Sequence, residues 1–185
     1  MPRTSDKRER LIEASRELMR RQGFDRTTLA DISRASGVPL GNVYYYFHTK
    51  EELLEAVANN LSDDFRTRAA QFEREPGPKG PLLAFLDSVV AGRRAFAEHG
   101  CPVGSLCQEI GKFSVEGREA MSQALILRAQ WASQQFRRMG QRDAQELGVW
   151  LIGSVQGVIL MAHALKDPEL IRRQVSQLKA WVSAF

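Results

Sequence analysis

The sequence predicts an all-α fold of about nine helices, in which a small N-terminal helical domain is followed by a larger helical domain. Apolar residues recur at steps of three and four along most of the chain, which is the period of amphipathic helices. Glycine and proline interrupt this pattern at intervals, as expected where helices end. No segment alternates apolar and polar residues in the way that predicts a half-buried strand.

The first predicted helix covers about residues 6–22, and its apolar positions share one face. The predicted inner stripe of the helix consists of Leu11, Ile12, Ser15, Leu18 and Met19, of which Ser15 is polar. Gly23 ends the helix, because glycine takes the positive φ that a chain needs on leaving a helix. With the two helices that follow, this helix forms a predicted domain over residues 1–48, which is too small to be very stable alone.

Residues 28–50 predict two short helices joined by a tight turn. Thr28 is a suitable N-cap for the first of them. Gly37 can take positive φ in the turn, and Pro39 suits the first turn of the second helix. Two short helices joined by a turn that contains glycine form a helix-turn-helix unit. The second helix of such a unit fits the major groove of DNA, which is about 12 Å wide.

The second of these helices is expected to bury Val43 and Phe47 and to leave its other side chains facing outward. On that outer face Asn42 can pair with an adenine edge, and Leu40 can pack on a thymine methyl group. Gly41 would let the backbone approach the bases. The other predicted contacts are to phosphate oxygens, which set the register on DNA without reading its sequence. They come from Thr28, Tyr44, Tyr45 and Lys50.

These residues also carry a family resemblance. TTLADISRASGV followed by NVYYYFHTKEELL resembles the DNA-binding domain of the TetR/AcrR family of bacterial transcriptional regulators, densely over about residues 7–54. GCPVGSL at residues 100–106 is similar to a segment of a subgroup of small regulators like LmrA and YxaF. The resemblance implies a ligand-responsive homodimer that binds a DNA operator. Many members carry arginine at the position of Ala30, so base recognition here rests more on residues 40–42.

The charge distribution agrees with a protein that binds DNA. Residues 1–50 hold ten Lys and Arg against six Asp and Glu, a net charge of +4, whereas residues 51–185 hold 16 of each sign. The positive excess therefore lies with the predicted helix-turn-helix, where phosphates must be neutralised. The first 23 residues are dense in Arg and Glu rather than apolar, and two cysteines make no disulfide framework. A cytoplasmic protein is expected.

The second predicted domain covers residues 49–185 and holds the other helices. A long helix starts after Thr49, with Glu52 completing a capping box, and runs to about Phe72. Proline and glycine then break the chain over residues 75–81. The remaining helices are expected at about residues 82–98, 103–113, 116–139, 143–165 and 168–185.

This domain has more large apolar side chains than a minimal core needs, so we expect a ligand pocket among them. A small hydrophobic or aromatic inducer would suit such a pocket. The predicted walls are Phe85, Val89, Phe96, Trp131, Trp150 and Met161, with Gln156 and His163 as the polar groups. The alternative is that all of these are ordinary core residues.

The last two helices are the predicted dimer interface. One recognition helix covers too few base pairs, and two-fold dimers place two such helices about 34–36 Å apart on the duplex. The interface residues are Trp150, Val155, Val158, Ile171, Val175, Leu178 and Val182. The alternative is that both helices only close the core of one subunit.

Residues 147–165 are uncharged, but Gln156 and His163 favour a helix buried on nearly all sides within protein over a membrane span.

Other kinds of site find little support. The sequence has no Gly-rich phosphate loop, HExxH or G-x-S-x-G motif, so neither catalytic residues nor a cofactor are expected. His99, Cys101 and Cys107 lack the spacing of a metal site. Besides a ligand-responsive repressor, two alternatives stay open. One is a regulator that senses oxidants through Cys101 and Cys107, and the other is a protein-interaction module without sequence-specific DNA binding. The sequence does not distinguish a repressor from an activator.

Overall fold

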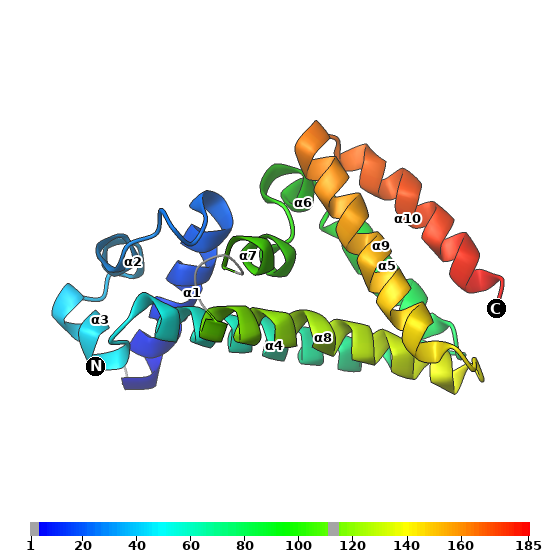
Figure 1. Ribbon diagram of the computed structural model, residues 1–185, viewed down its shortest axis with the longest axis horizontal. Coiled ribbons are helices and arrows are strands. Elements are labelled where there is room, and N and C mark those ends of the chain that lie inside the picture. The colour runs from blue at the N-terminus through cyan, green and yellow to red at the C-terminus, as the bar shows by residue number, and fades with distance from the viewer. Residues whose placement is uncertain (1–3, 111–114) are drawn as a thin grey trace. The chain divides into compact units, whose positions relative to one another are not determined.

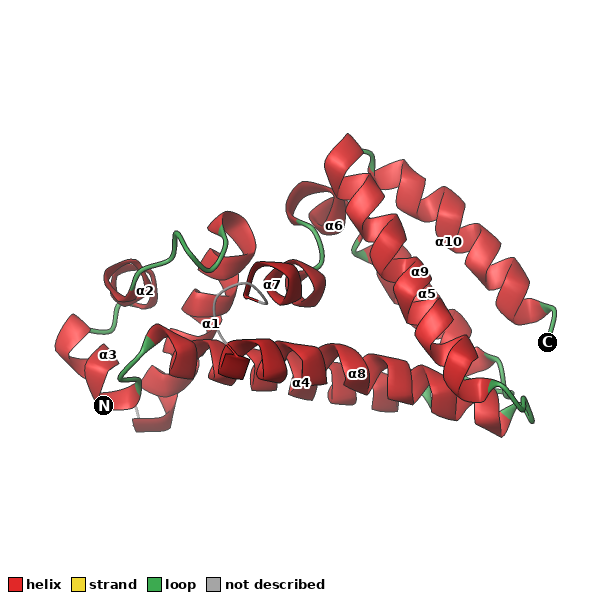
Figure 2. Ribbon diagram, viewed as in Figure 1, coloured by secondary structure: helices red, strands yellow, loops and turns green. Residues whose placement is uncertain are grey.

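The computed structural model describes residues 4–110 and 115–185, which form ten helices and no strand (Figure 1, Figure 2). The predicted all-α fold is therefore confirmed. The helices are α1 (Thr4–Gln22), α2 (Leu29–Ser36), α3 (Leu40–Tyr46), α4 (Lys50–Phe72), α5 (Gly80–Ala91), α6 (Arg93–His99), α7 (Pro102–Ile110), α8 (Val115–Arg138), α9 (Ala144–Leu165) and α10 (Pro168–Ser183). The predicted end of α7 near residue 113 lies outside the described residues.

The tenth helix arises at Gly92, which divides the single helix predicted over residues 82–98. Gly92 donates its N–H to Ser88 O at 3.1 Å and has a ψ of 0°, so α5 ends there and α6 begins. A Cβ at this position would lie 2.8 Å from Cε2 of Phe96. Glycine at this break therefore leaves room for the Phe96 ring to pack against the backbone.

The described helices divide into two compact units. One unit combines Met1–Ser62 with Pro102–Ala124, and the other combines Asp63–Cys101 with Leu125–Phe185. The first unit thus contains the predicted helix-turn-helix together with α7, and α4 and α8 each contribute residues to both units. The functional division into residues 1–48 and 49–185 remains a prediction.

The first unit is built around the apolar faces of α1 to α4. Fully buried side chains there include Leu11, Ile32, Val43, Leu53, Leu54 and Val57. Ser15 is also fully buried in α1, and its hydroxyl donates to Leu11 O at 2.6 Å, so it leaves no unpaired polar group. At the start of α4, Thr49 Oγ1 accepts from Glu52 N at 3.1 Å, whereas the Glu52 carboxylate accepts from His48 N at 2.7 Å. The hydrogen bond from Glu52 N to Thr49 is therefore formed as predicted, but the Glu52 carboxylate binds the N–H of His48 rather than that of Thr49.

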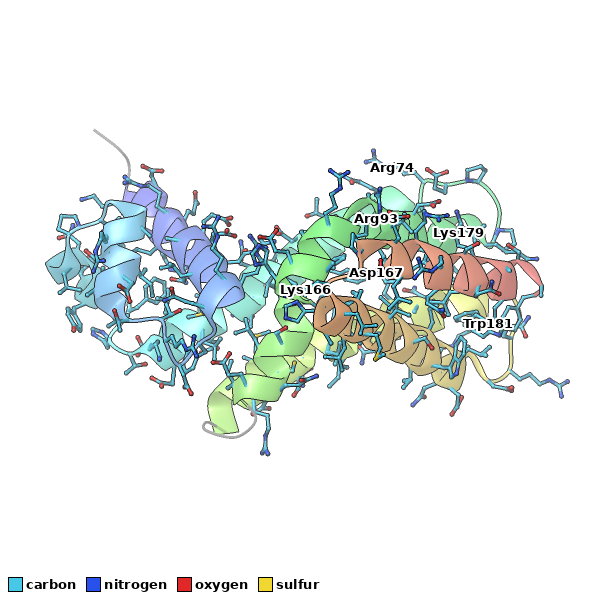
Figure 3. All side chains as sticks on the ribbon, turned by 90° about the horizontal axis from the view of Figure 1, so that it is seen from above. Arg74, Arg93, Lys166, Asp167, Lys179 and Trp181 are labelled. Carbon is cyan, nitrogen blue, oxygen red and sulfur yellow. The ribbon has the colours of Figure 1, made fainter. Side chains whose placement is uncertain are left out.

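The second unit places α10 against α5, α6 and α9. Ion pairs at its surface join α10 to the other helices: Lys179 Nζ lies 2.7 Å from Asp87 Oδ1, and Arg93 Nε lies 3.2 Å from Glu169 Oε1. Figure 3 labels the two basic residues of these pairs, Lys179 and Arg93. Between α9 and α10 the chain turns at Lys166, which has a positive φ of 53°. These contacts fix the last helix on its neighbours with its apolar stripe inward.

Helix α9 is buried on one face only, which differs from the expectation of burial on nearly all sides. Its inner face includes Gly148, where a Cβ would lie 2.5 Å from Ser133 N of α8. Its outer face is exposed and apolar. This outer face of α9 consists of Val149, Trp150, Gly153, Gly157, Leu160, Met161 and Leu165. Within residues 4–110 and 115–185, α9 is the one helix whose length and apolar composition would suit a membrane span, a test that core helices of soluble proteins also pass.

Candidate nucleic-acid interface

The first helix of the predicted helix-turn-helix begins at a complete capping box. Thr28 Oγ1 accepts from Asp31 N at 3.1 Å, and Asp31 Oδ2 accepts from Thr28 N at 3.2 Å. The Thr28 hydroxyl also donates to Asp31 Oδ2 at 2.6 Å, and this hydrogen bond is the main cause that lowers the pKa of Asp31. Thr28 is therefore the N-cap of α2, as predicted, but its hydroxyl proton is used by Asp31 and would have to turn to reach a phosphate.

The turn between α2 and α3 has the glycine geometry that the sequence predicts. Gly37 has φ +65° and ends α2 in the left-handed region. Within the turn, the Ser33 hydroxyl donates to Val38 O at 2.7 Å. From α1, Arg10 Nη2 donates to Ser36 O at 2.5 Å. That arginine, which sequence reasoning did not identify, therefore caps the C-terminal end of α2 and helps to set the direction of α3.

Helix α3 presents its predicted outer face to solvent. Val43 is fully buried, whereas Leu40 is 39% exposed, Tyr44 is 50% exposed and Tyr45 is 74% exposed. A Cβ added to Gly41 would meet nothing within 4 Å, so the backbone there is open to an incoming surface. Of the side chains proposed to read or contact DNA, those of Leu40, Tyr44 and Tyr45 are therefore exposed on α3, and that of Asn42 is partly exposed.

The seventh predicted contact, Lys50, is engaged within the protein. Its Nζ donates to Phe24 O at 2.9 Å, lies 3.4 Å from Asp25 O and sits 4.1 Å from the centroid of the Phe24 ring. An ammonium group has three protons, so one remains for another acceptor. Lys50 thus holds the loop before α2 in addition to any contact with phosphate.

In the second unit, four aromatic rings pack together, and two of them belong to the predicted pocket residues Phe85 and Trp131. The centroids of these two rings are 5.6 Å apart, and the rings of Phe65 and Phe72 lie 5.7 and 5.9 Å from that of Trp131. Edge-to-face packing of this kind stabilises the cluster beyond the area that it buries. We call Phe65, Phe72, Phe85 and Trp131 the aromatic cluster.

A carboxylate at the end of α4 adds polar contacts to the aromatic cluster. Glu73 Oε1 accepts from Trp131 Nε1 at 3.0 Å and from Gln135 Nε2 at 3.1 Å. Gln135 is 1% exposed, so this hydrogen bond satisfies a buried amide. Sequence reasoning did not identify Glu73 or Gln135, because both are polar and the predicted pocket consists mainly of large apolar side chains.

The other predicted pocket residues are placed differently. Val89 is buried in the same core as Phe85 and Trp131, and Phe96 packs partly against that core. His163 Nδ1 lies 3.2 Å from Ala97 O, and Gln156 is partly buried on α9. Trp150 and Met161 are 49% and 53% exposed on the outer face of α9. The structure therefore brings Phe85, Val89 and Trp131 together, but not Trp150 or Met161.

The predicted dimer residues also divide into two groups. The larger group packs inside the subunit, and it consists of Val155, Ile171, Val175, Leu178 and Val182. Trp150 is exposed and packs against Trp181, with ring centroids 4.3 Å apart, and Val158 is partly buried. The apolar stripe of α10 was expected at the dimer interface, but in the structure it packs in the subunit's own core. The exposed apolar surface is the outer face of α9.

The two cysteines are thiols rather than halves of a disulfide, and both are partly buried. Cys107 Sγ donates to Met121 O at 3.3 Å, and Cys101 packs against the core of the second unit. Of the residues that the structure describes, no three His, Cys, Asp or Glu side chains are grouped to hold a metal ion.

Comparison with known proteins places these features in a family. The chain matches the family described as "Bacterial regulatory proteins, tetR family" over residues 11–57. It is 28% identical over 171 residues to the HTH-type transcriptional regulator TtgR of Pseudomonas putida, covering 86% of this chain and 81% of TtgR. It is 29% identical over 170 residues to the HTH-type transcriptional regulator LmrA of Bacillus subtilis, covering 88% of this chain and 89% of LmrA.

Solved structures show the same fold. A TetR transcriptional regulator from Legionella pneumophila superposes with a TM-score of 0.83 at 17% identity, covering 100% of this chain and 97% of that chain. The matched helix-turn-helix is the unit whose α3 presents Leu40, Tyr44 and Tyr45 to solvent. The helix-turn-helix of residues 11–57 matches the tetR family of bacterial regulatory proteins, and most of the chain is similar to HTH-type transcriptional regulators of that kind.

Proposed function

We propose that this protein is a cytoplasmic, ligand-responsive repressor that binds a palindromic DNA operator as a homodimer. In this proposal residues 1–48 bind DNA, and residues 49–185 form the dimer and bind a small hydrophobic or aromatic inducer. The observation that carries the DNA-binding part is the exposure of Leu40, Tyr44 and Tyr45 on one face of α3, while Val43 anchors the opposite face in the core.

Asn42 and Gly41 are the proposed base-reading residues on this face. The amide of Asn42 offers a donor and an acceptor, which match the N7 and N6 groups of adenine. Gly41 has no side chain, and the open space around it would let the backbone approach the base edges. The hydroxyl groups of Tyr44 and Tyr45 would reach phosphates, together with Thr28 and the third proton of Lys50.

The outer face of α9 supports the homodimer. Leu160 and Met161 are more than half exposed in one subunit, and Gly153 and Gly157 have nothing within 4 Å of a built Cβ. Exposed apolar surface of this extent on a helix is typical of a protein interface. A two-fold related copy of the same helix would cover it and would pair the two recognition helices on one side of the duplex.

The aromatic cluster supports the inducer site. Its rings would form the apolar wall, and the Glu73 carboxylate beside Trp131 would orient a polar group of the ligand. An inducer acts only through a difference in affinity between the DNA-binding state and the released state. Because the four rings pack against one another in the present structure, a ligand that enters the aromatic cluster would have to displace some of them.

Selection of bound duplexes from a random DNA pool tests the proposal. The expected product is an inverted repeat whose half-site centres are about 34–36 Å apart, or a multiple of one helical turn. Affinity for the selected duplex should fall with salt at a log–log slope of about −0.9 for each phosphate contacted. A pool that shows no enrichment, or an affinity that does not change with salt, would instead indicate a protein-interaction module.

Two variants separate base reading from phosphate contact on the selected duplex. Asn42→Ala should relax the preference at one base position, at a cost of about 1–3 kcal/mol for the preferred base. Tyr44→Phe keeps the ring and removes the hydroxyl, so it should weaken binding to all duplexes alike. If Asn42→Ala leaves the selected sequence unchanged, Asn42 is not a base-reading residue.

A further inference from the structure

The loop of residues 23–27, between α1 and α2, determines where α2 begins because it leads directly into the N-cap Thr28. Part of its backbone is satisfied within the loop. Thr27 N donates to Phe24 O at 3.1 Å, and the Thr27 hydroxyl donates to Gly23 O at 2.7 Å. Thr27 is fully buried, so these hydrogen bonds are shielded from water.

One peptide group of this loop is held from both ends by charged side chains that are distant in the sequence. The Phe24 carbonyl accepts from Lys50 Nζ at 2.9 Å. The N–H of the same peptide group, on Asp25, donates to Glu109 Oε1 of α7 at 2.9 Å. A cation at the oxygen and an anion at the N–H both favour the natural polarity of the peptide group, so each hydrogen bond strengthens the other.

The position of Glu109 is one at which a carboxylate needs a compensating partner. It lies in the last turn of α7, where the partial negative charge of the helix end disfavours an anion. The space for its carboxylate exists because residue 23 is glycine, since a Cβ there would lie 2.9 Å from Glu109 Oε1. Glycine is therefore suited to position 23 for two reasons: its φ at the end of α1 is +84°, and Glu109 approaches its backbone closely.

We propose that Glu109 is a positioning residue for DNA recognition, which acts by fixing the Phe24–Asp25 peptide group and hence the start of α2. This inference rests on the proposed DNA-binding function. It makes α7 part of the structure that sets the orientation of α2 and α3. Gly100 and Cys101 connect α7 to the second unit along the chain. A displacement of α7 would therefore displace Glu109 and, through the Phe24–Asp25 peptide group, the start of α2.

Three substitutions at Glu109 test the role in the full-length protein. Glu109→Gln keeps an oxygen acceptor at the same distance, whereas Glu109→Asp is too short by one methylene and Glu109→Ala has no acceptor. The first readout is hydrogen exchange of the Asp25 amide, which does not depend on DNA. Loss of a hydrogen bond to a charged group should accelerate exchange about tenfold in the Asp and Ala variants, and Gln should retain most of the protection.

The second readout is affinity for the duplex selected from the random pool, at fixed salt. Glu109→Ala and Glu109→Asp should bind it roughly three- to tenfold more weakly, since part of that hydrogen-bond energy no longer holds α2 in place. The matched control is Glu119→Ala, which removes an exposed carboxylate from the same unit and should strengthen binding slightly through charge alone.

Each outcome decides a separate point. Unchanged Asp25 exchange in Glu109→Ala, or a gain in affinity like that of Glu119→Ala, would overturn the positioning role. Faster exchange with unaltered DNA affinity would also overturn it, because the loop contact would then have no effect on recognition. If the native protein enriches no duplex, the proposed DNA-binding function fails, and the Asp25 exchange still reports whether Glu109 holds the loop.

Discussion

Arg10 and Ser36 are joined by a hydrogen bond of 2.5 Å from the guanidinium Nη2 to the backbone carbonyl, which links α1 to the last turn of α2. The next residue, Gly37, has φ +65° and would place a Cβ 2.9 Å from the same Nη2. Glycine is therefore needed here for two reasons, its backbone conformation and the space that the arginine occupies.

Gly37→Ala should destabilise the fold by about 1–2 kcal/mol, because alanine disfavours the left-handed region and the Arg10 side chain must also move. Urea unfolding measures this change. The matched control is Gly41→Ala, where no atom lies within 4 Å of the new Cβ and φ is not positive. That control should be neutral or stabilising by up to about 1 kcal/mol through helix propensity. Equal destabilisation by both variants would show that neither reason applies at Gly37.

The helix-turn-helix could be predicted from sequence because its signals are local. Thr28, Gly37 and Pro39 each act through their own backbone, so their roles do not depend on distant residues. The Arg10 cap and the Glu109 contact could not be predicted in this way, because long polar side chains reach groups that only the tertiary fold brings near. The break at Gly92 was missed for the same reason, since a helix tolerates glycine and the Phe96 ring decides the outcome.

Glu17 should contribute to stability in a way that depends on pH. Both of its oxygens accept hydrogen bonds from Arg20, at 2.9 and 2.7 Å. These bonds, opposed by partial burial and assisted by Arg21, lower the pKa of Glu17 from 4.5 to about 2. A pKa that is lower in the folded state adds stability above the unfolded value, and this stability is lost as pH falls from about 4.5 towards 2.

Glu17→Gln isolates that contribution. The difference in unfolding free energy between the native protein and the variant should be constant above about pH 4.5 and should shrink towards zero near pH 2. The carboxylate side chain is 41% exposed, so solvent screening limits the plateau to about 1 kcal/mol or less. Glu55→Gln, an exposed carboxylate of α4, is the control. A difference that stays the same from pH 6 down to pH 2 would contradict the assigned pKa.

Gly148 should be the least replaceable glycine of α9. A Cβ there would lie 2.2 Å from Ser133 Oγ and, more seriously, 2.5 and 2.8 Å from the backbone atoms Ser133 N and Ala129 O of α8. Backbone atoms cannot rotate away, so α8 and α9 would have to separate. Gly148→Ala should therefore destabilise the fold by about 3 kcal/mol, measured by thermal or urea unfolding. Gly153→Ala on the outer face is the control, and its subunit fold should be unaffected.

The predicted dimer residues of α10 show where periodicity alone is insufficient. The spacing of Ile171, Val175, Leu178 and Val182 correctly indicates a buried stripe, but the same spacing serves a subunit core and a dimer seam equally well. The polar residues of α10 could have shown that its apolar stripe faces the core of the subunit. Its other face carries Arg172, Arg173 and Gln174, which are exposed and polar. The outer face of α9, from Val149 to Leu165, carries no charged side chain.

Leu160→Glu should dissociate the proposed homodimer while leaving each subunit folded. Leu160 is 52% exposed at the middle of the outer face of α9, so a carboxylate is tolerated in the isolated subunit but would be buried without a partner in a two-fold interface. Such a charge costs about 3–5 kcal/mol, which corresponds to a dissociation constant raised at least about a hundredfold. Analytical ultracentrifugation measures this constant, and circular dichroism checks the helix content. Gln174→Glu introduces the same charge on the polar face of α10 and should leave the association unchanged. If Leu160→Glu sediments as the native protein does, the subunits associate through another surface, and the outer face of α9 must serve some other contact.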